Sequence, residues 1–405
     1  MADARLGFSR RALLGSALGA AALGLMPQRA RAAGARGATL KVTPCDLHLR
    51  HAWTLSRNSS SVKHNLVVTL TCDGISGQGE AAPNVRFHET TESARAALLR
   101  AAPILAALHP SQHVELNRRL RQALPDAPSA RCALDVALWD WNARALGAPL
   151  YRVLGLSPLQ APPTSFSLGI APRAELQAKV REAAAYPLLK IKLGAKPAEG
   201  ISDREIIQAV RAAAPGKRLR IDPNEGWTLA QAREHLAWLA ALPGVGGGPL
   251  VELCEQPLPA ADLAGLRALH RGDDESRAPL PILLDESVLD AGQIPQLVDA
   301  ADGVVIKLQK AGGISPALEQ ITVARALGLK VMLGCMIESS LGITAAAHLA
   351  ALCDYVDLDG HLLVADDPFR GVSVVAEEGR LRLPGVGVDG AGGLPGLGVV
   401  AARAM

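Results

Sequence analysis

The chain has 405 residues, 49% of them hydrophobic, and a formal net charge of +3. Five arginines and one aspartate, a net charge of +4, lie in residues 1–32, which leaves −1 (+3 less +4) for the rest. With only four Phe, five Trp and three Tyr residues, the composition excludes a basic, aromatic-rich surface for nucleic acid, and it does not indicate a membrane surface. The length suits two domains.

Residues 1–32 resemble a twin-arginine export signal. Arg10 and Arg11 precede a soft apolar run over 12–26, and Ala30-Arg31-Ala32 is a small-residue cleavage site. The run is short and rich in Ala and Gly, so it does not predict a membrane span; an uncleaved N-terminal anchor is the alternative. We expect export through the twin-arginine machinery to the periplasm or another external location, with no stable membrane association after cleavage.

Residues 39–148 predict an α+β domain. Alternating or apolar runs predict three strands, and stretches of helical period follow them. The strands are expected at 40–49, 65–72 and 74–80, and the helices at 91–108, 112–123 and 130–146.

Residues 149–380 predict eight parallel strands alternating with helices, which indicates a closed barrel. The repeat is one of architecture, not of sequence, so a tandem solenoid is not expected. The strands are expected at 164–170, 188–193, 218–222, 251–255, 282–285, 304–307, 330–333 and 355–358, with helices at 204–213, 229–242 and 314–327. A segment rich in Gly and Pro, 381–405, is expected to return to the first domain.

Charged residues mark the ends of these strands. Asp222, Glu255 and Asp285 end the third, fourth and fifth strands, so they are expected at one rim, where such barrels carry their chemistry. Lys192 on the second strand and Lys307 on the sixth lie four strands apart in a ring of eight, and are therefore expected on opposite sides.

This set of residues suits proton transfer at carbon. Carboxylate oxygens suit Mg²⁺, and a cation bound to a substrate carboxylate acidifies the neighbouring α-carbon. Lys190 shares a strand face with Lys192 and places a positive charge next to it. One lysine can then remove a proton while the lysine opposite returns one, which inverts the carbon.

Structural alternatives exist for each residue alone. A Lys-x-Lys pair is usually solvated, but here its flanks at 188–189, 191 and 193 are apolar. Asp222 before Pro223 suits a turn, and Glu255 and Asp285 suit helix caps. Three such coincidences at successive strand ends, with a lysine opposite, favour a common site.

Six segments carry a family resemblance that extends from about residue 40 to residue 398. They are LKIKLG, RIDPNEGW, CEQPL, LLDES, VIKLQKAGG and GCMIESSLGITAAAHLA. The sequence resembles the enolase superfamily, its muconate-lactonizing subgroup and, within that, the dipeptide epimerases. The resemblance implies a (β/α)7β-type modified TIM barrel with an N-terminal α+β capping domain, whose loops around Arg57 and 83–88 close over the barrel mouth.

The resemblance also implies roles for individual residues. Asp222, Glu255 and Asp285 would bind one Mg²⁺ per subunit, with Asn224 supporting them. Lys192 and Lys307 would be the acid/base pair, and Lys190 an electrostatic helper.

Two further positions concern the substrate. Asp357 and Asp359 resemble the pair that holds the N-terminal ammonium of a dipeptide; a solvated strand end is the alternative. Arg57 aligns with a loop arginine that faces a glutamate side chain in L-Ala-D/L-Glu epimerases; an ordinary surface arginine is the alternative. The role of Glu338 near the seventh strand end is left open.

We therefore expect an Mg-dependent dipeptide epimerase, an isomerase, acting on L-Ala-D/L-Glu from peptidoglycan turnover. The reaction would be a two-lysine 1,1-proton transfer at the α-carbon of the C-terminal residue, through a metal-stabilised ene-diolate. The alternatives are a cycloisomerase, an N-acylamino acid racemase or an o-succinylbenzoate synthase of the same subgroup, and a non-catalytic exported peptide-binding protein. The sequence leaves a homo-oligomer open.

Overall fold

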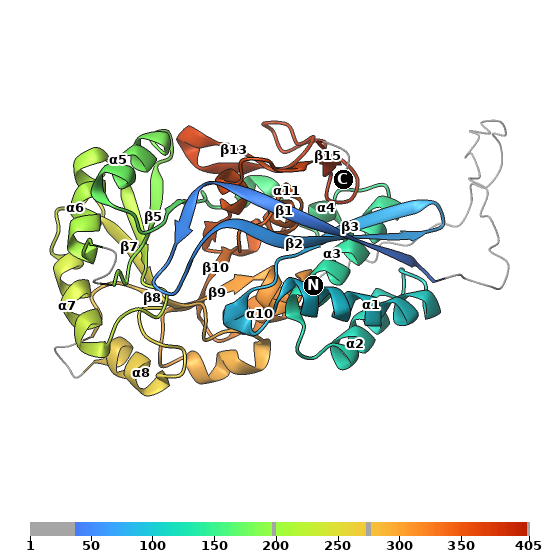
Figure 1. The fold of residues 1–405 in the computed structure, drawn as a ribbon, viewed down its shortest axis with the longest axis horizontal. Helices are drawn as coiled ribbons and strands as arrows, with labels where there is room; N and C mark the ends of the chain where they lie inside the picture. Colours follow the sequence, from blue (N-terminus) through green and yellow to red (C-terminus); the bar gives the residue numbers. More distant parts are fainter. Residues whose placement is uncertain (1–36, 197–199, 273–276, 403–405) are drawn as a thin grey trace, which may run out of the picture. The chain divides into compact units, whose positions relative to one another are not determined.

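The computed structural model describes residues 37–196, 200–272 and 277–402 (Figure 1). The predicted export signal, residues 1–32, lies outside the described residues. Among the residues that the structure does describe, no helix combines the length and the hydropathy that crossing a membrane requires.

The N-terminal part is an antiparallel sheet with three helices. The sheet order is β1-β2-β3, with β1 (Thr39–Thr54), β2 (Ser59–Cys72) and β3 (Ile75–Ala81). The helices are α1 (Thr91–Ala107), α2 (His113–Ala123) and α3 (Pro128–Ala145). Their apolar faces form one buried cluster with the sheet. The predicted α+β arrangement of this region is confirmed.

Two glycines let α3 lie directly on β3. A Cβ atom built on Gly77 would lie 2.1 Å from the carbonyl oxygen of Ala137. On Gly79 it would lie 2.1 Å from the carbonyl oxygen of Ala133. No side chain fits at such a distance, so the close approach of helix to strand depends on these two positions.

The first two strands are longer than predicted. β1 continues to Thr54 and β2 begins at Ser59, where the sequence predicted strand only over 40–49 and 65–72. Residues 50–64 are mostly polar, and without an apolar alternation the sequence does not distinguish an exposed strand from a loop. As Figure 1 shows, β1 and β2 run side by side; a turn closed by the Leu55 N–H to the Asn58 carbonyl (2.9 Å) places Arg57 at their tip.

The barrel consists of eight parallel strands in the order β11-β10-β9-β8-β7-β6-β5-β4. A parallel bridge between Thr164 and Val356 joins its two outer strands, and the Ser165 N–H lies 3.4 Å from the Val356 carbonyl oxygen. The strands are β4 (Phe166–Leu168), β5 (Leu188–Lys192), β6 (Arg218–Asp222), β7 (Val251–Glu255), β8 (Ile282–Leu284), β9 (Gly303–Lys307), β10 (Lys330–Gly334) and β11 (Tyr355–Asp357). The predicted barrel is confirmed.

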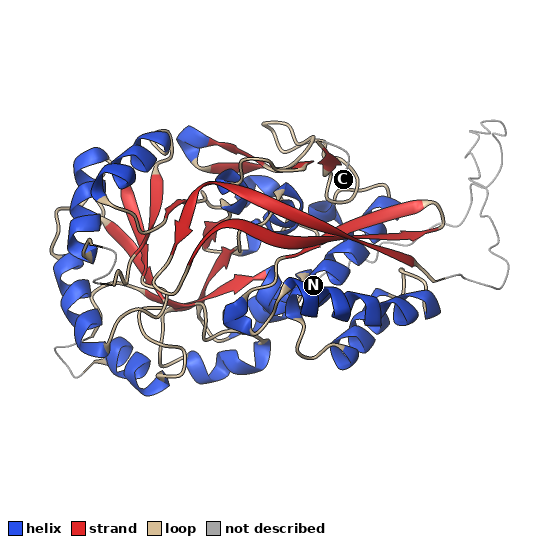
Figure 2. Ribbon diagram, in the orientation of Figure 1, coloured by secondary structure: helices blue, strands red, loops and turns tan. Residues whose placement is uncertain are grey.

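Helices lie on the outside of these strands (Figure 2). Ser202 is the N-cap of α6 and Thr228 the N-cap of α7, and the side chain of each accepts the backbone N–H three residues on, as a capping box. The helices are α5 (Arg173–Glu182), α6 (Asp203–Ala213), α7 (Leu229–Ala240), α8 (Leu263–Arg271), α10 (Ile314–Ala326) and α11 (Ser340–Ala347). A 3-10 helix, η4 (Ala291–Leu297), stands between β8 and β9, and β11 is followed by the 3-10 turn η6 (Gly360–Leu363), so the last strand has no α-helix directly after it.

A layer of apolar side chains fills the barrel below its mouth. Leu253, Leu283, Val305 and Met332 form a buried cluster of their own, apart from the core between strands and helices. Because strand side chains alternate, the residue two positions further on points the same way. Those residues are Glu255, Asp285, Lys307 and Gly334, so the packing inside the barrel aims the charged residues into its mouth.

The C-terminal segment contacts the first helices. The Leu397 N–H donates to Asp140 Oδ1 of α3 (2.8 Å), and the Leu150 N–H donates to the Gly396 carbonyl (2.9 Å). The remaining short elements are η1 (Val85–Phe87), α4 (Leu150–Val153), η2 (Pro158–Gln160), α9 (Leu308–Ala311), η5 (Ala350–Leu352), η7 (Ala376–Glu378), β12 (Phe369–Arg370), β13 (Ser373–Val375), β14 (Arg380–Arg382) and β15 (Val400–Ala401). β15 pairs with β12, and β13 with β14.

The contact between α3 and β3 gives a stability prediction. Gly79→Ala should lower the free energy of unfolding by about 1–3 kcal/mol, because the added methyl group forces the helix away from the strand. Chemical denaturation measures this change. Gly216→Ala is the control, because a Cβ at Gly216 meets nothing within 4 Å and the backbone there is not in the left-handed region. Equal stability of both variants would contradict the proposed role of Gly79.

Candidate active site

The barrel brings the predicted catalytic residues together at the ends of neighbouring strands. Lys192 ends β5, Asp222 ends β6, Glu255 ends β7, and Asp285 follows β8 directly. Lys307 ends β9, four strands from Lys192 in the sheet order. All of these side chains are buried or nearly so.

The two lysines expected to face each other hold different carboxylates. Lys192 Nζ lies 2.5 Å from Asp222 Oδ2, and Lys307 Nζ lies 2.7 Å from Asp285 Oδ2. Each lysine is therefore anchored to an acid on the strand next to its own, on its own side of the barrel.

Lys190 lies at the centre of the charge cluster. Its Nζ is 2.6 Å from Glu255 Oε2, 2.7 Å from Asp357 Oδ2 and 3.3 Å from Asp222 Oδ2. Burial by itself would lower the pKa of Lys190, but Asp357, Glu255 and Asp222 outweigh it and hold that pKa well above its usual value. Lys190 is therefore a fixed positive charge.

The three candidate metal ligands differ in pKa. Burial would raise the pKa of Asp222, but Lys192 and Lys190 lower it overall. Lys307 and Lys310 likewise overcome burial and hold the pKa of Asp285 well below its usual value. Burial and the nearby Asp222 raise the pKa of Glu255 to about 8, so Glu255 is the acid least compensated by the lysines.

The donor set fits a hard divalent cation. Within the described residues, neither Oε1 nor Oε2 of Glu255 has a hydrogen-bond partner, although Lys190 makes an ion-pair contact with Oε2. Asp285 Oδ1 likewise has no hydrogen-bond partner among them, although Lys310 Nζ makes an ion-pair contact with it at 2.8 Å. Buried carboxylate oxygens without hydrogen bonds are suitable ligands for Mg²⁺, which binds oxygen. Asp222, Glu255 and Asp285 could therefore hold this ion.

Asn224 orients Asp222. Its backbone N–H donates to Asp222 Oδ1 (2.9 Å), and its side-chain Nδ2 donates to Oδ2 (3.2 Å). The backbone of Asn224 has φ +47°, a left-handed conformation that Asn tolerates better than most residues. These contacts hold the carboxylate of Asp222 in one orientation.

The paired acids Asp357 and Asp359 line the same cavity. Asp357 accepts from Ser165 Oγ (2.6 Å) as well as from Lys190. Asp359 accepts the Ser167 N–H (2.5 Å), and burial together with Asp357 raises its pKa to about 7. A cationic group arriving here would find two acids whose repulsion is only partly relieved.

That cavity has a volume of about 830 Å³ and lies between the β1–β2 tip, the loop around η1 and the barrel mouth. Lys192, Lys307 and Asp357 line it from the barrel, and Arg57 and Arg86 from the N-terminal part. The cavity is large enough to take a small peptide.

Arg57 is already paired, which the sequence did not predict. Its guanidinium donates to Glu225 Oε2 (2.9 Å), Glu286 Oε1 (2.8 Å) and the Asn224 carbonyl (2.9 Å). Arg86 binds both oxygens of Glu225, at 2.7 and 2.8 Å. Glu225 therefore ties both N-terminal loops to the barrel, and an anionic group must share Arg57 with two glutamates.

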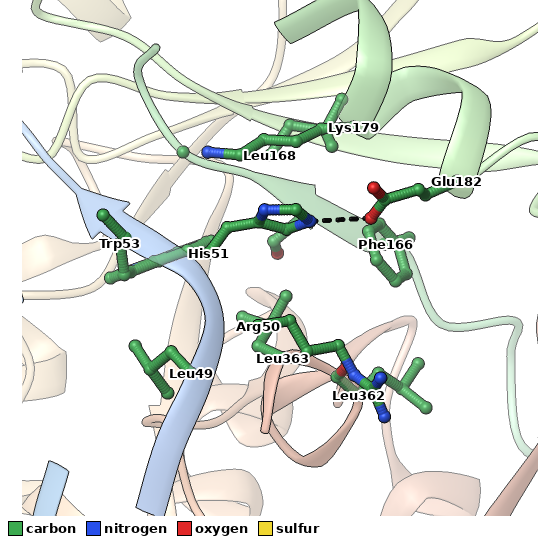
Figure 3. A pocket seen from close by; sticks show the side chains of 13 residues that line it. Leu49, Arg50, His51, Trp53, Phe166, Leu168, Lys179, Glu182, Leu362 and Leu363 are labelled. Carbon is green, nitrogen blue, oxygen red and sulfur yellow. Dashed lines mark hydrogen bonds and ion pairs between the residues drawn. The ribbon is translucent and has the colours of Figure 1, made fainter. Parts of the chain in front are cut away.

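A smaller cavity adjoins the larger one. Ser167 lines both cavities. Figure 3 shows His51 of β1 pointing at Glu182 of α5, and their side chains are 2.7 Å apart. This pair ties the end of β1 to a barrel helix.

Lys310 is a site residue that the sequence analysis missed. Its Nζ lies 2.8 Å from Asp285 Oδ1 and donates to the carbonyls of Asp285 (2.5 Å), Val288 (2.9 Å) and Val305 (2.8 Å). The second lysine of the VIKLQKAGG segment was the available signal. Lys310 lies three residues beyond the end of a strand, so strand alternation does not predict whether its side chain points toward the site or away from it.

Glu338, whose role was open, contacts neighbouring elements. It accepts from Gln309 Nε2 (2.7 Å) and from the Met336 N–H (3.0 Å). Burial and Glu80 raise its pKa to about 8. Glu338 thus joins the start of α9 to the segment that leads into α11.

Family comparison matches both parts of the chain. Residues 38–155 match the mandelate racemase / muconate lactonizing enzyme N-terminal domain, and residues 173–403 match the enolase C-terminal domain-like family.

Individual relatives carry epimerase names. The chain is 40% identical over 353 residues to an L-Ala-D/L-amino acid epimerase of Pedosphaera parvula, covering 84% of this chain and 95% of that protein. It is 33% identical to an L-Ala-D/L-Glu epimerase of Bacteroides thetaiotaomicron, covering 87% and 88%. The structure resembles that of a dipeptide epimerase from Cytophaga hutchinsonii complexed with Mg and D-Ala-L-Val, with a TM-score of 0.80, 25% identity and coverage of 91% and 96%.

The contacts of Lys310 predict a large loss on substitution. Lys310→Met should lower the free energy of unfolding by about 3–5 kcal/mol. The substitution removes a buried cation and leaves Asp285 and three backbone carbonyls without their partner. Denaturant unfolding measures the loss. Lys330→Met, at the exposed start of β10, should change stability by less than about 1 kcal/mol. A small loss for Lys310→Met would contradict the anchoring role.

Proposed function

The chain belongs to the mandelate racemase/muconate lactonizing enzyme family of the enolase superfamily, and we propose that it is an isomerase that epimerises dipeptides. One observation carries the proposal: Lys192 and Lys307 enter one cavity from strands four apart, each beside a different candidate metal ligand. The names of the relatives support the same activity.

Asp222, Glu255 and Asp285 are proposed to hold Mg²⁺. When bound, this ion supplies positive charge that compensates the charge of these carboxylates and acidifies the α-carbon next to a substrate carboxylate. The relative complexed with Mg supports the choice of ion.

Lys192 and Lys307 are proposed to move the proton. A lysine that acts as base must be neutral, and in the structure Asp285 and Glu255 overcome burial and raise the pKa of Lys307. When these two carboxylates hold Mg²⁺ instead, burial is the remaining effect, and it lowers the pKa of Lys307 toward neutral pH. One lysine then removes the α-proton of the C-terminal residue and the other delivers a proton to the opposite face. The α-carbon is inverted, and no other bond changes.

Asp357 and Asp359 are proposed to bind the substrate ammonium. Asp359 is buried beside Asp357, and burial, together with the charge of Asp357, raises its pKa to about 7. An ammonium group between them supplies the missing positive charge. This requirement favours a dipeptide with a free N-terminal ammonium over substrates of the same family that lack an ammonium group.

The C-terminal side chain is proposed to be glutamate, bound by Arg57 at the cavity wall. A second candidate is an uncharged side chain, and the ion pairs of Arg57 with Glu225 and Glu286 favour it. The names of relatives include both kinds of substrate. We also propose that residues 1–32 direct export to the periplasm, where dipeptides from peptidoglycan turnover would be available.

Isotope exchange tests the two-lysine mechanism. The mature protein with Mg²⁺ and L-Ala-L-Glu in D₂O should replace the α-proton of the C-terminal residue and epimerise it, as NMR will detect. Lys192→Ala and Lys307→Ala should each slow epimerisation by about 10³-fold or more, because each removes the acid/base on one face. Each variant should still exchange the α-proton of one epimer only, and a different one in each case.

Lys330→Ala serves as the control for these variants, because Lys330 is the first residue of β10, at the end of the strand away from the barrel mouth. Full activity of either Lys192→Ala or Lys307→Ala would disprove the mechanism. Binding without exchange for every dipeptide tried would disprove the proposed activity.

Competing dipeptides test the role of Arg57. If glutamate is the native side chain, Arg57→Met should reduce kcat/KM for L-Ala-L-Glu by about 30-fold or more, the value of a charged hydrogen bond, and affect L-Ala-L-Val much less. Arg86→Met is the matched control, because Arg86 shares Glu225 but not Glu286. The uncharged side chain would be established if the wild type preferred L-Ala-L-Val and if Arg57→Met lowered kcat/KM equally for both dipeptides.

A further inference from the structure

We propose that the N-terminal part carries a second metal site, for Zn²⁺, formed by Cys72, Asp73 and His109. Cys72 ends β2, Asp73 lies in the turn to β3, and His109 lies in the loop between α1 and α2. One ligand atom from each residue lies within 4.8 Å of the other two. The proposal is independent of the barrel site.

The ligand types separate this site from the barrel site. Thiolate, imidazole and carboxylate together suit Zn²⁺, whereas Mg²⁺ requires oxygen ligands. His109 Nε2 and Asp73 Oδ2 are 2.9 Å apart. In a tetrahedral site with bonds of about 2.0 Å the two atoms would be about 3.3 Å apart, so a small movement is sufficient.

Neighbouring groups hold the ligands in place. His109 Nδ1 lies 2.7 Å from Ser111 Oγ, which fixes the ring and directs Nε2 toward Asp73. The His109 ring meets the Trp141 ring edge-on, with centroids 5.1 Å apart. Trp141 Nε1 in turn donates to the Cys72 carbonyl (3.1 Å). The indole therefore positions two of the three ligands.

The three ligands differ in burial. Cys72 and His109 are buried, at 5% and 8% exposure, while Asp73 is at the surface. Asp73 has φ +51°, a left-handed turn conformation that directs the chain into β3. Three protein ligands are one fewer than the four of a closed tetrahedral zinc site.

Metal binding would rearrange protons at the site. The Cys72 thiol would lose its proton to solvent and bind as thiolate. In the structure Nε2 of His109 is hydrogen bonded to Asp73, and Nδ1 accepts the Ser111 N–H (3.3 Å). With the ion bound, the ring proton would lie on Nδ1, which would give up the N–H contact and donate to Ser111 Oγ. The ion would then join the β2–β3 turn to the α1–α2 loop, 36 residues away in the chain.

Co²⁺ absorption tests this site. The metal-free full-length protein is titrated with Co²⁺ in excess Mg²⁺, which occupies the barrel ligands. A sulfur-to-metal charge-transfer band should appear in the near ultraviolet and disappear on addition of Zn²⁺. Carboxylate ligands produce no such band, so the barrel site does not contribute to it.

Variants assign the band. Cys72→Ser should abolish it, His109→Ala should weaken Zn²⁺ binding at least about 100-fold, and Ser111→Ala should weaken it about 10-fold. Asp73→Asn changes an exposed side chain and tests the site if Cys72→Ser fails to fold. Cys335→Ser, in the barrel cavity, should retain the full band. Absence of the band in the wild type, or its loss in Cys335→Ser alone, would overturn the proposal.

Discussion

The ion pairs of Lys190 with Glu255, Asp357 and Asp222 hold together carboxylates that would otherwise repel one another inside the barrel. Buried charges are tolerated when each has a partner. Lys190 is that partner for both the candidate metal ligands and the candidate ammonium site. Its position therefore couples the two halves of the proposed substrate site, and the remaining charges are arranged around it.

The barrel packing and the charge cluster depend on each other. Apolar residues such as Leu253 and Val305 fill the layer below, and strand alternation then directs Glu255 and Lys307 into the mouth. Lys310 fixes Asp285 from the outside of its strand, through the carboxylate and three carbonyls. Lysines therefore contact both oxygens of Asp285, and Oε1 of Glu255 is the carboxylate oxygen of this group that has neither a hydrogen bond nor an ion-pair contact among the described residues.

The N-terminal part completes the site through a few long-range contacts. Gly77 and Gly79 allow α3 to lie on β3, and this sheet extends β1 and β2 toward the barrel. At the tip, Arg57 binds Glu225 and Glu286, and Arg86 binds Glu225. These ion pairs join the N-terminal loops to the barrel beside the cavity, and they place two glutamates next to Arg57, the residue expected to contact the substrate side chain. Any role of Arg57 in binding a substrate anion therefore depends on its ion pairs with these two glutamates.

The sequence by itself determined the barrel, the α+β part and the positions of the charged residues at strand ends, because apolar periodicity and strand order are local properties. It did not determine the length of β1 and β2, since polar strands lack that periodicity. It also did not predict the contacts of Lys310. Nor did it predict that Arg57 pairs with Glu225 and Glu286, which lie 168 and 229 residues further along the chain. Only the tertiary structure decides which charges meet, because burial removes water as the alternative partner and makes each pairing depend on distant residues.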